Sequence, residues 1–104
     1  MGFIWDLDDW QQNVGEWAEK TFPQSTQDSI IKHLQHEANV ELMPDCDPEE
    51  LADVALLLLH LAHKRGISLV QEMRNKFHRN QQRKWGEKNS QGFQEHLPEA
   101  TKTQ

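Results

Sequence analysis

Apolar side chains recur at three- and four-residue steps along most of the chain, and no long stretch alternates with a period of two. Such spacing is typical of helices that bury one face. The pattern predicts helices at about residues 8–21, 27–42, 48–65 and 68–85. Because the links between them are short, we expect an all-α, four-helix bundle.

Capping residues mark several of these boundaries. Ser25 or Thr26 can cap the second helix, and Asp47 followed by Pro48 suits the start of the third. Gly66 suits the left-handed position just past the end of that helix. Capping chemistry and apolar spacing therefore predict the same helix boundaries.

The third predicted helix is apolar nearly all round, from Leu51 through Val54 and Leu58 to Leu61. A thin bundle of 104 residues cannot cover such a helix on every side. We therefore expect a homo-oligomer, either a dimer or a tetramer arranged as a dimer of dimers, in which a partner subunit completes the bundle.

Length and composition fit one domain, with residues 1–90 forming the helical part and residues 91–104 a polar, flexible tail. No basic segment followed by an apolar one stands at the N-terminus, and the apolar run of residues 54–59 is too short to span a membrane. The single cysteine, Cys46, has no partner for an internal disulfide. These features predict a soluble, cytoplasmic protein that does not contact membranes.

Charge is distributed unevenly along the chain. Residues 1–66 hold 13 acidic against 4 basic side chains, whereas residues 67–104 hold 4 acidic against 7 basic ones, for a net charge of −6. The acidic balance argues against direct binding of DNA or RNA. Solvated helix faces would account for the asymmetry, and so would an acidic part that holds a cation beside a basic part that holds an anion.

Two pairs of carboxylates stand out on the second and third predicted helices. Glu37 and Glu41 are four residues apart, and Glu50 and Asp53 are three apart, so each pair shares a helix face. The short link between the helices allows the pairs to meet, and converging carboxylates repel one another unless a cation binds. Glutamate pairs at this spacing are common on solvated acidic faces. The apolar neighbours of Asp53 on the helix expected to be most buried point to the alternative, a site for Mg²⁺, for which Mn²⁺ can substitute.

Basic side chains follow on the fourth predicted helix. Lys76, Asn80 and Arg83 step by four and three residues, so they share one face. Such groups can hold phosphate oxygens, and the alternative is a solvated basic helix end.

These residues together resemble the MazG superfamily of all-α nucleoside triphosphate pyrophosphatases, whose signature is E-E-x-x-E on one helix and E-x-x-D on the next. Glu50 to Asp53 supplies E-x-x-D. The stretch His33-Leu34-Gln35-His36-Glu37-Ala38 and the pattern K-x-x-x-N-x-x-R-x-W, which ends at Trp85, are similar to short phage-type members directed at dATP and dGTP. The resemblance covers about residues 3–97.

The first motif departs from the family pattern. Its last glutamate falls on Val40, and Glu41 comes one residue later. Either a local adjustment of the helix brings Glu41 into the site, or the second helix supplies a single metal ligand.

The resemblance implies hydrolysis of a (d)NTP, a purine such as dGTP, GTP or dATP, to the monophosphate and pyrophosphate. Catalysis would rest on Glu37, Glu50 and Asp53, which with Glu41 would ligate Mg²⁺, and a water acidified by the metal would attack a phosphorus. The resemblance also implies substrate-binding roles for Lys76, Asn80, Arg83 and Trp85.

The base pocket is harder to identify from the sequence. Asn13, Trp17 and His33 are candidates, as are Trp10 and Gln11, because an aromatic ring can stack on a base and an amide can read its edge. Trp10 and Trp17 also lie on the apolar stripe of the first predicted helix, which favours core packing for both. His60 and His63, three apart on the third predicted helix, are interpreted as satisfied core or interface groups.

Two alternatives to the enzyme remain open at this point. One is a non-catalytic helical oligomerisation module whose carboxylates are surface charges. The other is a small regulator that binds nucleotides without cleaving them.

Overall fold

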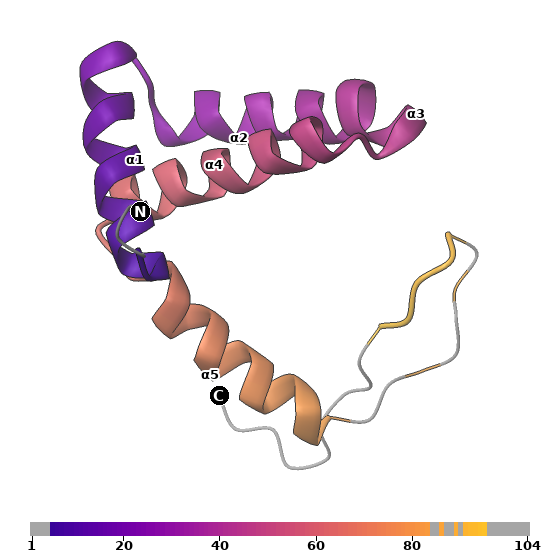
Figure 1. The fold of residues 1–104 in the computed structure, drawn as a ribbon. Helices are drawn as coiled ribbons and strands as arrows, with labels where there is room; N and C mark the ends of the chain where they lie inside the picture. The colour runs from indigo at the N-terminus through magenta and orange to yellow at the C-terminus, as the bar shows by residue number, and fades with distance from the viewer. Residues whose placement is uncertain (1–4, 84–85, 87–88, 90, 96–104) are drawn as a thin grey trace. The chain divides into compact units, whose positions relative to one another are not determined.

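The computed structural model describes residues 5–83, Gly86, Asn89 and residues 91–95. Over these residues all regular structure is helical and no strand is present, which confirms the predicted all-α class. None of the described helices has the length and apolar character needed to cross a membrane. In chain order the elements are α1 (Leu7–Thr21), α2 (Gln27–His36), the π-helical η1 (Glu37–Leu42), α3 (Met43–Asp45), α4 (Pro48–Arg65) and α5 (Leu69–Gln82) (Figure 1).

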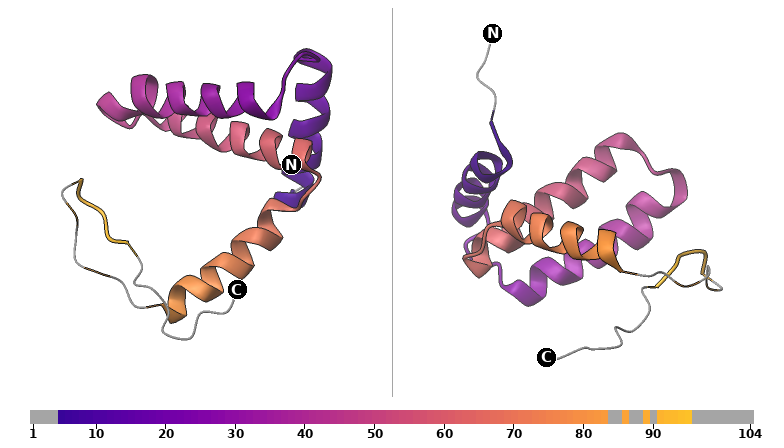
Figure 2. Two further views of the ribbon diagram at one scale, coloured as in Figure 1. Left: turned by 180° about the vertical axis from the view of Figure 1, so that it is seen from behind. Right: turned by 90° about the horizontal axis from the view of Figure 1, so that it is seen from below.

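The chain separates into two compact units, residues 1–70 and residues 71–104. In the first unit, α4 packs against both α1 and α2. Figures 1 and 2 show α2 and α4 side by side, with α1 across one end of the pair. The chain turns back between them at Cys46, whose φ of 52° ends α3 in the left-handed region. This hairpin brings the helices that carry the acidic pairs together.

The predicted caps are confirmed where the structure describes them. The Thr26 hydroxyl accepts from the backbone N–H of Ser29 at the start of α2, and the Asp47 carboxylate accepts from the backbone N–H of Glu49 at the start of α4. Gly66 ends α4 with φ 70° and ψ 30°. Each of these groups satisfies a backbone hydrogen-bonding group at a helix end or permits the left-handed turn there, so the boundaries are fixed locally.

The face of α1 that is buried is not the predicted apolar stripe but the face next to it. Gln11, Gly15 and Ala18 are buried, whereas Trp10 and Trp17 are 44% and 58% exposed. Core packing of the two tryptophans is therefore a wrong prediction for the single chain. Small residues form the buried face because α1 approaches α4 closely: the space for a Cβ on Gly15 is occupied by the ring of His63.

Gln11 ties α1 to the link between α4 and α5. Its Nε2 donates to the backbone carbonyl of Ile67 at 2.5 Å, and its Oε1 accepts from the backbone N–H of Leu69 at 2.8 Å. The Ser68 hydroxyl adds a hydrogen bond to Oδ1 of Asp8 at 2.8 Å. Both ends of the Gln11 amide thus hold the fold together, by binding the backbone between α4 and α5.

The apolar core of the described residues is small. Ala18, Ile30, Leu59 and Ala62 are its buried members. On α4, by contrast, the side chains of three leucines are 40–53% exposed, namely Leu51, Leu56 and Leu58. Within the described part of one chain, α4 is therefore not buried on all sides as the sequence predicts.

The second unit contains most of α5 and the segment after it. The predicted helix over 68–85 ends earlier, because the Arg83 N–H donates to the carbonyl of Asn80 at 3.3 Å, only three residues back, and this tighter turn closes α5. Further on, Oδ1 of Asn89 accepts from the N–H groups of Gln91 and Phe93. Trp85 and the tail beyond residue 95 lie outside the described residues, and the boundary at residue 90 stays a prediction.

Candidate active site

Three of the four predicted acidic residues come together in the first unit. One carboxylate oxygen each from Glu37 in η1 and from Glu50 and Asp53 in α4 lie within 4.8 Å of one another. Glu37 is buried, Glu50 is half-buried and Asp53 is exposed. The hairpin of α2, η1 and α4 is what places them together, since neither helix alone holds all three.

This acidic cluster, defined as Glu37, Glu50 and Asp53, concentrates negative charge. Partial burial raises the pKa of Glu50 above its usual value of 4.5, and repulsion from the carboxylates of Glu37, Glu41 and Asp53 adds to the rise. Oxygen-only donors at this spacing suit a hard divalent cation, which would remove the repulsion. The residues present therefore fit the metal that the sequence predicts.

The position of Glu41 is shaped by the π-helical turn. In η1 the N–H of Met43 donates to the carbonyl of Ala38, five residues back, so this turn holds one residue more than an α-helical turn. The wider turn comes just before Pro44, whose ring would clash with the carbonyl of Val40 in a regular α-helix. A local helix adjustment beside Glu41 is thus present in the structure.

Glu41 lies near the acidic cluster but is not a member of it. Its Oε2 is 3.8 Å from Nε2 of His36, and its charge contributes to the raised pKa of Glu50. A role for Glu41 as a metal ligand remains a prediction.

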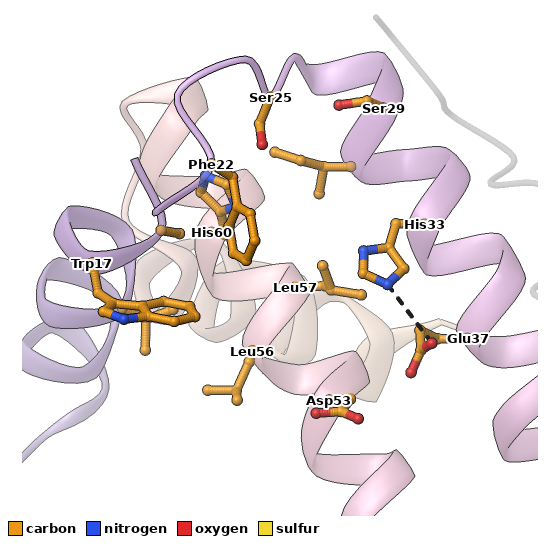
Figure 3. A pocket seen from close by; sticks show the side chains of 13 residues that line it. Trp17, Phe22, Ser25, Ser29, His33, Glu37, Asp53, Leu56, Leu57 and His60 are labelled. Atoms are coloured by element: carbon orange, nitrogen blue, oxygen red, sulfur yellow. Dashed lines mark ion pairs between the residues drawn. The ribbon is translucent and has the colours of Figure 1, made fainter. Parts of the chain in front are cut away.

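A pocket of about 520 Å³ opens beside the acidic cluster and is lined at that end by Glu37 and Asp53 (Figure 3). Ser29, His33 and Glu37 step by four residues along α2 and η1 and form one wall. Asp53, Leu57 and His60 step by four and three along α4 and form another. On both helices the lining side chains therefore extend along one helix face from the carboxylates into the pocket.

The far end of the pocket is aromatic. Trp17 and Phe22 meet edge to face, with ring centroids 5.5 Å apart and an interplanar angle of 87°. Both line the pocket together with Ser25, and Figure 3 shows the Trp17 indole on the side where α1 lies. The structure thus places the predicted residue Trp17 in a position where its ring can contact a bound planar group.

Of the other predicted base-contacting residues, only some line the pocket. His33 lines the pocket, and its Nε2 is 3.7 Å from Oε2 of Glu37, so it borders both the pocket and the acidic cluster. Asn13 is not among the described residues that line the pocket, and its side-chain NH₂ donates to the backbone carbonyl of Asp9 at 2.8 Å. Trp10 also lies away from the lining and packs edge to face on Trp5.

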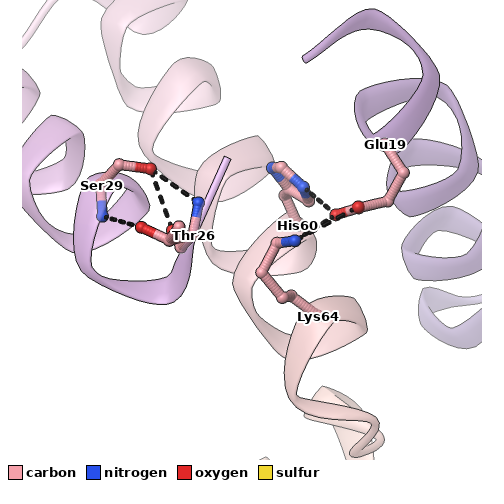
Figure 4. A network of polar contacts seen from close by, with 5 residues as sticks. All are labelled: Glu19, Thr26, Ser29, His60 and Lys64. Atoms are coloured by element: carbon pink, nitrogen blue, oxygen red, sulfur yellow. Dashed lines mark hydrogen bonds and ion pairs between the residues drawn. The ribbon is translucent and has the colours of Figure 1, made fainter. Parts of the chain in front are cut away.

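A polar network that the sequence did not reveal joins α1 to α4. Nε2 of His60 is 2.8 Å from Oε2 of Glu19, and Nζ of Lys64 is 3.1 Å from the same oxygen (Figure 4). His60 is only 4% exposed and also lines the pocket, which confirms that it is a satisfied core group on its Nε2 side. Seven residues separate His60 from Asp53, a spacing that places both on one helix face; nothing in the sequence indicates the pairing with Glu19.

The Glu19 network should make stability depend on pH. The hydrogen bond from His60, followed by that from Lys64, lowers the pKa of Glu19 below 4.5 in the folded state. This stabilisation is present above the unfolded-state pKa and is lost as the pH falls through the folded-state pKa. Because the Glu19 side chain is 36% exposed, we expect Glu19→Gln to cost about 1 kcal/mol or less at neutral pH.

Thermal unfolding of both proteins from about pH 7 to about pH 3 measures this effect. The difference in Tm between wild type and Glu19→Gln should shrink as the pH falls below about 4. A difference that grows toward acid pH would contradict the assignment.

The predicted phosphate-binding residues lie in the second unit. Nη1 of Arg83 donates to Oδ1 of Asn80 at 3.4 Å, which agrees with a shared face at the end of α5. Lys76 lies on the same helix, one turn before Asn80. The acidic cluster and the pocket belong to the first unit, and the role of these three side chains remains a prediction from the sequence pattern.

Comparisons of the sequence with known proteins agree on a single family. A family model described as dATP/dGTP pyrophosphohydrolase matches residues 10–103. A dATP/dGTP diphosphohydrolase of Salmonella phage PMBT28 is 33% identical over 96 residues, which cover 91% of this chain and 33% of that protein. The chain thus spans about a third of the length of this curated relative.

Among solved structures, the chain resembles a MazG-like pyrophosphohydrolase of cyanophage S-2L, bound to dGDP and three catalytic Mn²⁺ ions per active site. The two share 27% sequence identity with a TM-score of 0.78, and the match covers 91% of this chain and 100% of that one. This likeness confirms the MazG-like fold expected from the sequence.

Proposed function

Because the chain belongs to the dATP/dGTP pyrophosphohydrolase family, we propose that it hydrolyses dATP or dGTP to the monophosphate and pyrophosphate with Mg²⁺ or Mn²⁺. The observation that carries this proposal is the acidic cluster, whose three carboxylates converge within 4.8 Å at one end of a pocket. A surface acidic patch would not combine such convergence with an adjoining aromatic cavity. The phage relative and the dGDP-bound neighbour support the choice of a purine nucleotide.

The roles of the residues follow from their places in the pocket. Glu37, Glu50 and Asp53 would hold the metal, with Glu41 as a further ligand. A divalent cation there would neutralise phosphate charge and acidify water. With the triphosphate held at this end, the Trp17 ring would be placed to stack on the base.

Further substrate contacts are proposed from the family pattern. The K-x-x-x-N-x-x-R-x-W sequence adds Lys76, Asn80, Arg83 and Trp85 as residues that bind the phosphates or the sugar. His33 would contact the nucleotide from its place beside Glu37. Asn13 is proposed from the sequence alone and is not among the described residues that line the pocket.

Product analysis tests the proposed reaction. The protein is incubated with each of the four deoxy- and four ribonucleoside triphosphates in the presence of Mg²⁺ or Mn²⁺, and the products are resolved by chromatography. We expect dAMP or dGMP together with pyrophosphate, and no turnover after chelation by EDTA. Release of inorganic phosphate, or no turnover of any of these nucleotides with either metal, would refute the proposal.

The exposed leucines of α4 support the proposed homo-oligomer, in which a second copy of the chain would cover them. Leu51 and Leu58 are 53% and 41% exposed on an apolar helix, and so small a buried core leaves a single chain short of apolar burial. Light scattering coupled to gel filtration should give a multiple of 12.2 kDa for the wild type. Leu58→Glu should shift that mass toward the monomer, and a monomeric wild type would contradict the proposal.

A further inference from the structure

We propose that His60 determines base specificity: its Nδ1 accepts a hydrogen bond from the exocyclic amino group of the purine, and Glu19 is the positioning residue that fixes the ring for this contact. The inference rests on the proposed function, because it requires the base to occupy the pocket. It goes further by naming the atom that reads the base and the chemical group that is read.

The hydrogen-bonding partners of His60 set the state of its ring. Nε2 lies 2.8 Å from a carboxylate oxygen of Glu19, and an ionised carboxylate only accepts hydrogen bonds, so the proton belongs to Nε2. In the neutral imidazole the second nitrogen, Nδ1, is then an acceptor. No group among the described residues hydrogen-bonds to Nδ1. A side chain that is only 4% exposed thus retains an unused acceptor.

The charges around the ring agree with the neutral form. Lys64 contacts both carboxylate oxygens of Glu19, at 3.2 Å and 3.1 Å, so its charge already balances that of the carboxylate. A protonated His60 would add an uncompensated positive charge at a buried position. The network of Glu19, His60 and Lys64 is therefore complete with a neutral imidazole whose Nδ1 accepts.

The place of His60 in the pocket suits contact with a base. Asp53 and His60 both line the pocket and are seven residues apart on α4, or about 10 Å along the helix axis. This span is comparable to the length of a nucleoside, so phosphates held at Asp53 leave the base at the level of His60. Phe22 lines the same pocket as His60.

An acceptor on the protein selects a donor on the base. Adenine carries an amino group at C6 and guanine carries one at C2. Guanine also has an N1–H donor, but the hypoxanthine of dITP keeps it, so comparing dGTP with dITP isolates the amino group. A purine without the amino group would leave the buried Nδ1 without a partner, which typically lowers affinity by about tenfold to a hundredfold. Both purines share the required chemistry, so the experiment must include an arm for each.

The first test compares kcat/KM for matched nucleotides. The adenine arm compares dATP with 2′-deoxypurine riboside triphosphate, and the guanine arm compares dGTP with dITP. In the wild type we expect the amino-bearing nucleotide to be preferred by about tenfold or more in at least one arm. His60→Phe should bring that ratio close to one. His63→Ala, which removes a histidine three residues away that does not line the pocket, should keep it.

Two results of this test would overturn the inference. One is a wild type that shows no preference in either arm. The other is a preference that His60→Phe leaves unchanged.

A second test does not depend on hydrolysis or on the folding of the His60 variant. Nitrogen NMR of ¹⁵N-histidine-labelled wild-type protein should show His60 with a protonated Nε2 and an unprotonated Nδ1. Adding dAMP or dGMP should shift the Nδ1 resonance toward the hydrogen-bonded range, and dIMP should shift it less than dGMP does. A proton on Nδ1, or an Nδ1 resonance that responds to neither dAMP nor dGMP, would overturn the inference.

The Glu19→Gln variant tests the positioning role with the same signal. An amide can donate as well as accept, so the substituted side chain can donate to an unprotonated Nε2 and should move part of the population to the Nδ1–H form. The preference in kcat/KM for the amino-bearing nucleotide should fall as the Nδ1–H population grows. An unchanged tautomer in Glu19→Gln would remove the role assigned to Glu19.

If no triphosphate is hydrolysed but Nδ1 still responds to the monophosphates, the proposed reaction fails and the base contact stands.

Discussion

Glu50→Gln should lower kcat for dATP or dGTP by about a thousandfold while raising the Tm of the metal-free protein. Activity falls because one carboxylate of the acidic cluster is lost, and metal stabilisation of phosphoryl transfer is worth several kcal/mol, with about 1.4 kcal/mol for each tenfold change. Stability rises because the pKa of Glu50 is raised in the folded state. Such a group favours folding below its unfolded-state pKa and opposes it once the pH exceeds its folded-state pKa.

The neighbouring residue provides a matched control. Glu49 also lies in the first turn of α4 but is exposed and is not part of the acidic cluster, so Glu49→Gln should leave kcat within about twofold of wild type. Steady-state kinetics and thermal unfolding with and without Mn²⁺ measure both effects. A Glu50→Gln protein that retains activity, or that is less stable without metal than the wild type, would contradict the assignment of the cluster.

Gly15→Ala should destabilise the protein by about 2 kcal/mol, although alanine is the better helix former by about 1 kcal/mol. The added Cβ would overlap the ring of His63, and helix α1 would have to move away from α4 to make room. For a chain of this size such a loss corresponds to a fall in Tm of about 10 °C. Thermal or urea unfolding measures it.

A second substitution tests the cause. In a His63→Ala background the ring is gone, so Gly15→Ala should become neutral or stabilising through helix propensity alone. The double-mutant cycle thus predicts that the loss of stability caused by Gly15→Ala disappears or reverses once His63 is replaced. An equal loss of stability in both backgrounds would show that the contact with His63 is not the reason.

The helices and their caps could be predicted because their signals are local. Thr26, Asp47 and Gly66 act on backbone groups within a few residues of themselves. The three carboxylates of the acidic cluster needed only a short antiparallel link between their helices to meet. The family pattern added the fold and the proposed reaction. These elements required no knowledge of side chains distant in the sequence.

What the sequence could not predict depends on how closely two helices approach. The apolar stripe suggested that Trp10 and Trp17 face the core, but the smaller Gly15 and Ala18 do so, because close approach to α4 outweighs the area that a tryptophan would bury. The same approach places Glu19 beside His60 across 41 residues of chain. Such pairings have no periodic signal and become visible only once the helices are placed.

The π-helical turn also changes how insertions in this motif should be counted. Between Glu37 and Glu41 the chain has one residue more than the family spacing, and the π-helical turn likewise holds one residue more than an α-helical turn. Removing Asn39 would give the spacing E-x-x-E and restore an ordinary α-helical turn. An alignment that compares letters position by position places Val40 opposite the last glutamate of the family motif, whereas an alignment that allows for the wider turn would place Glu41 there.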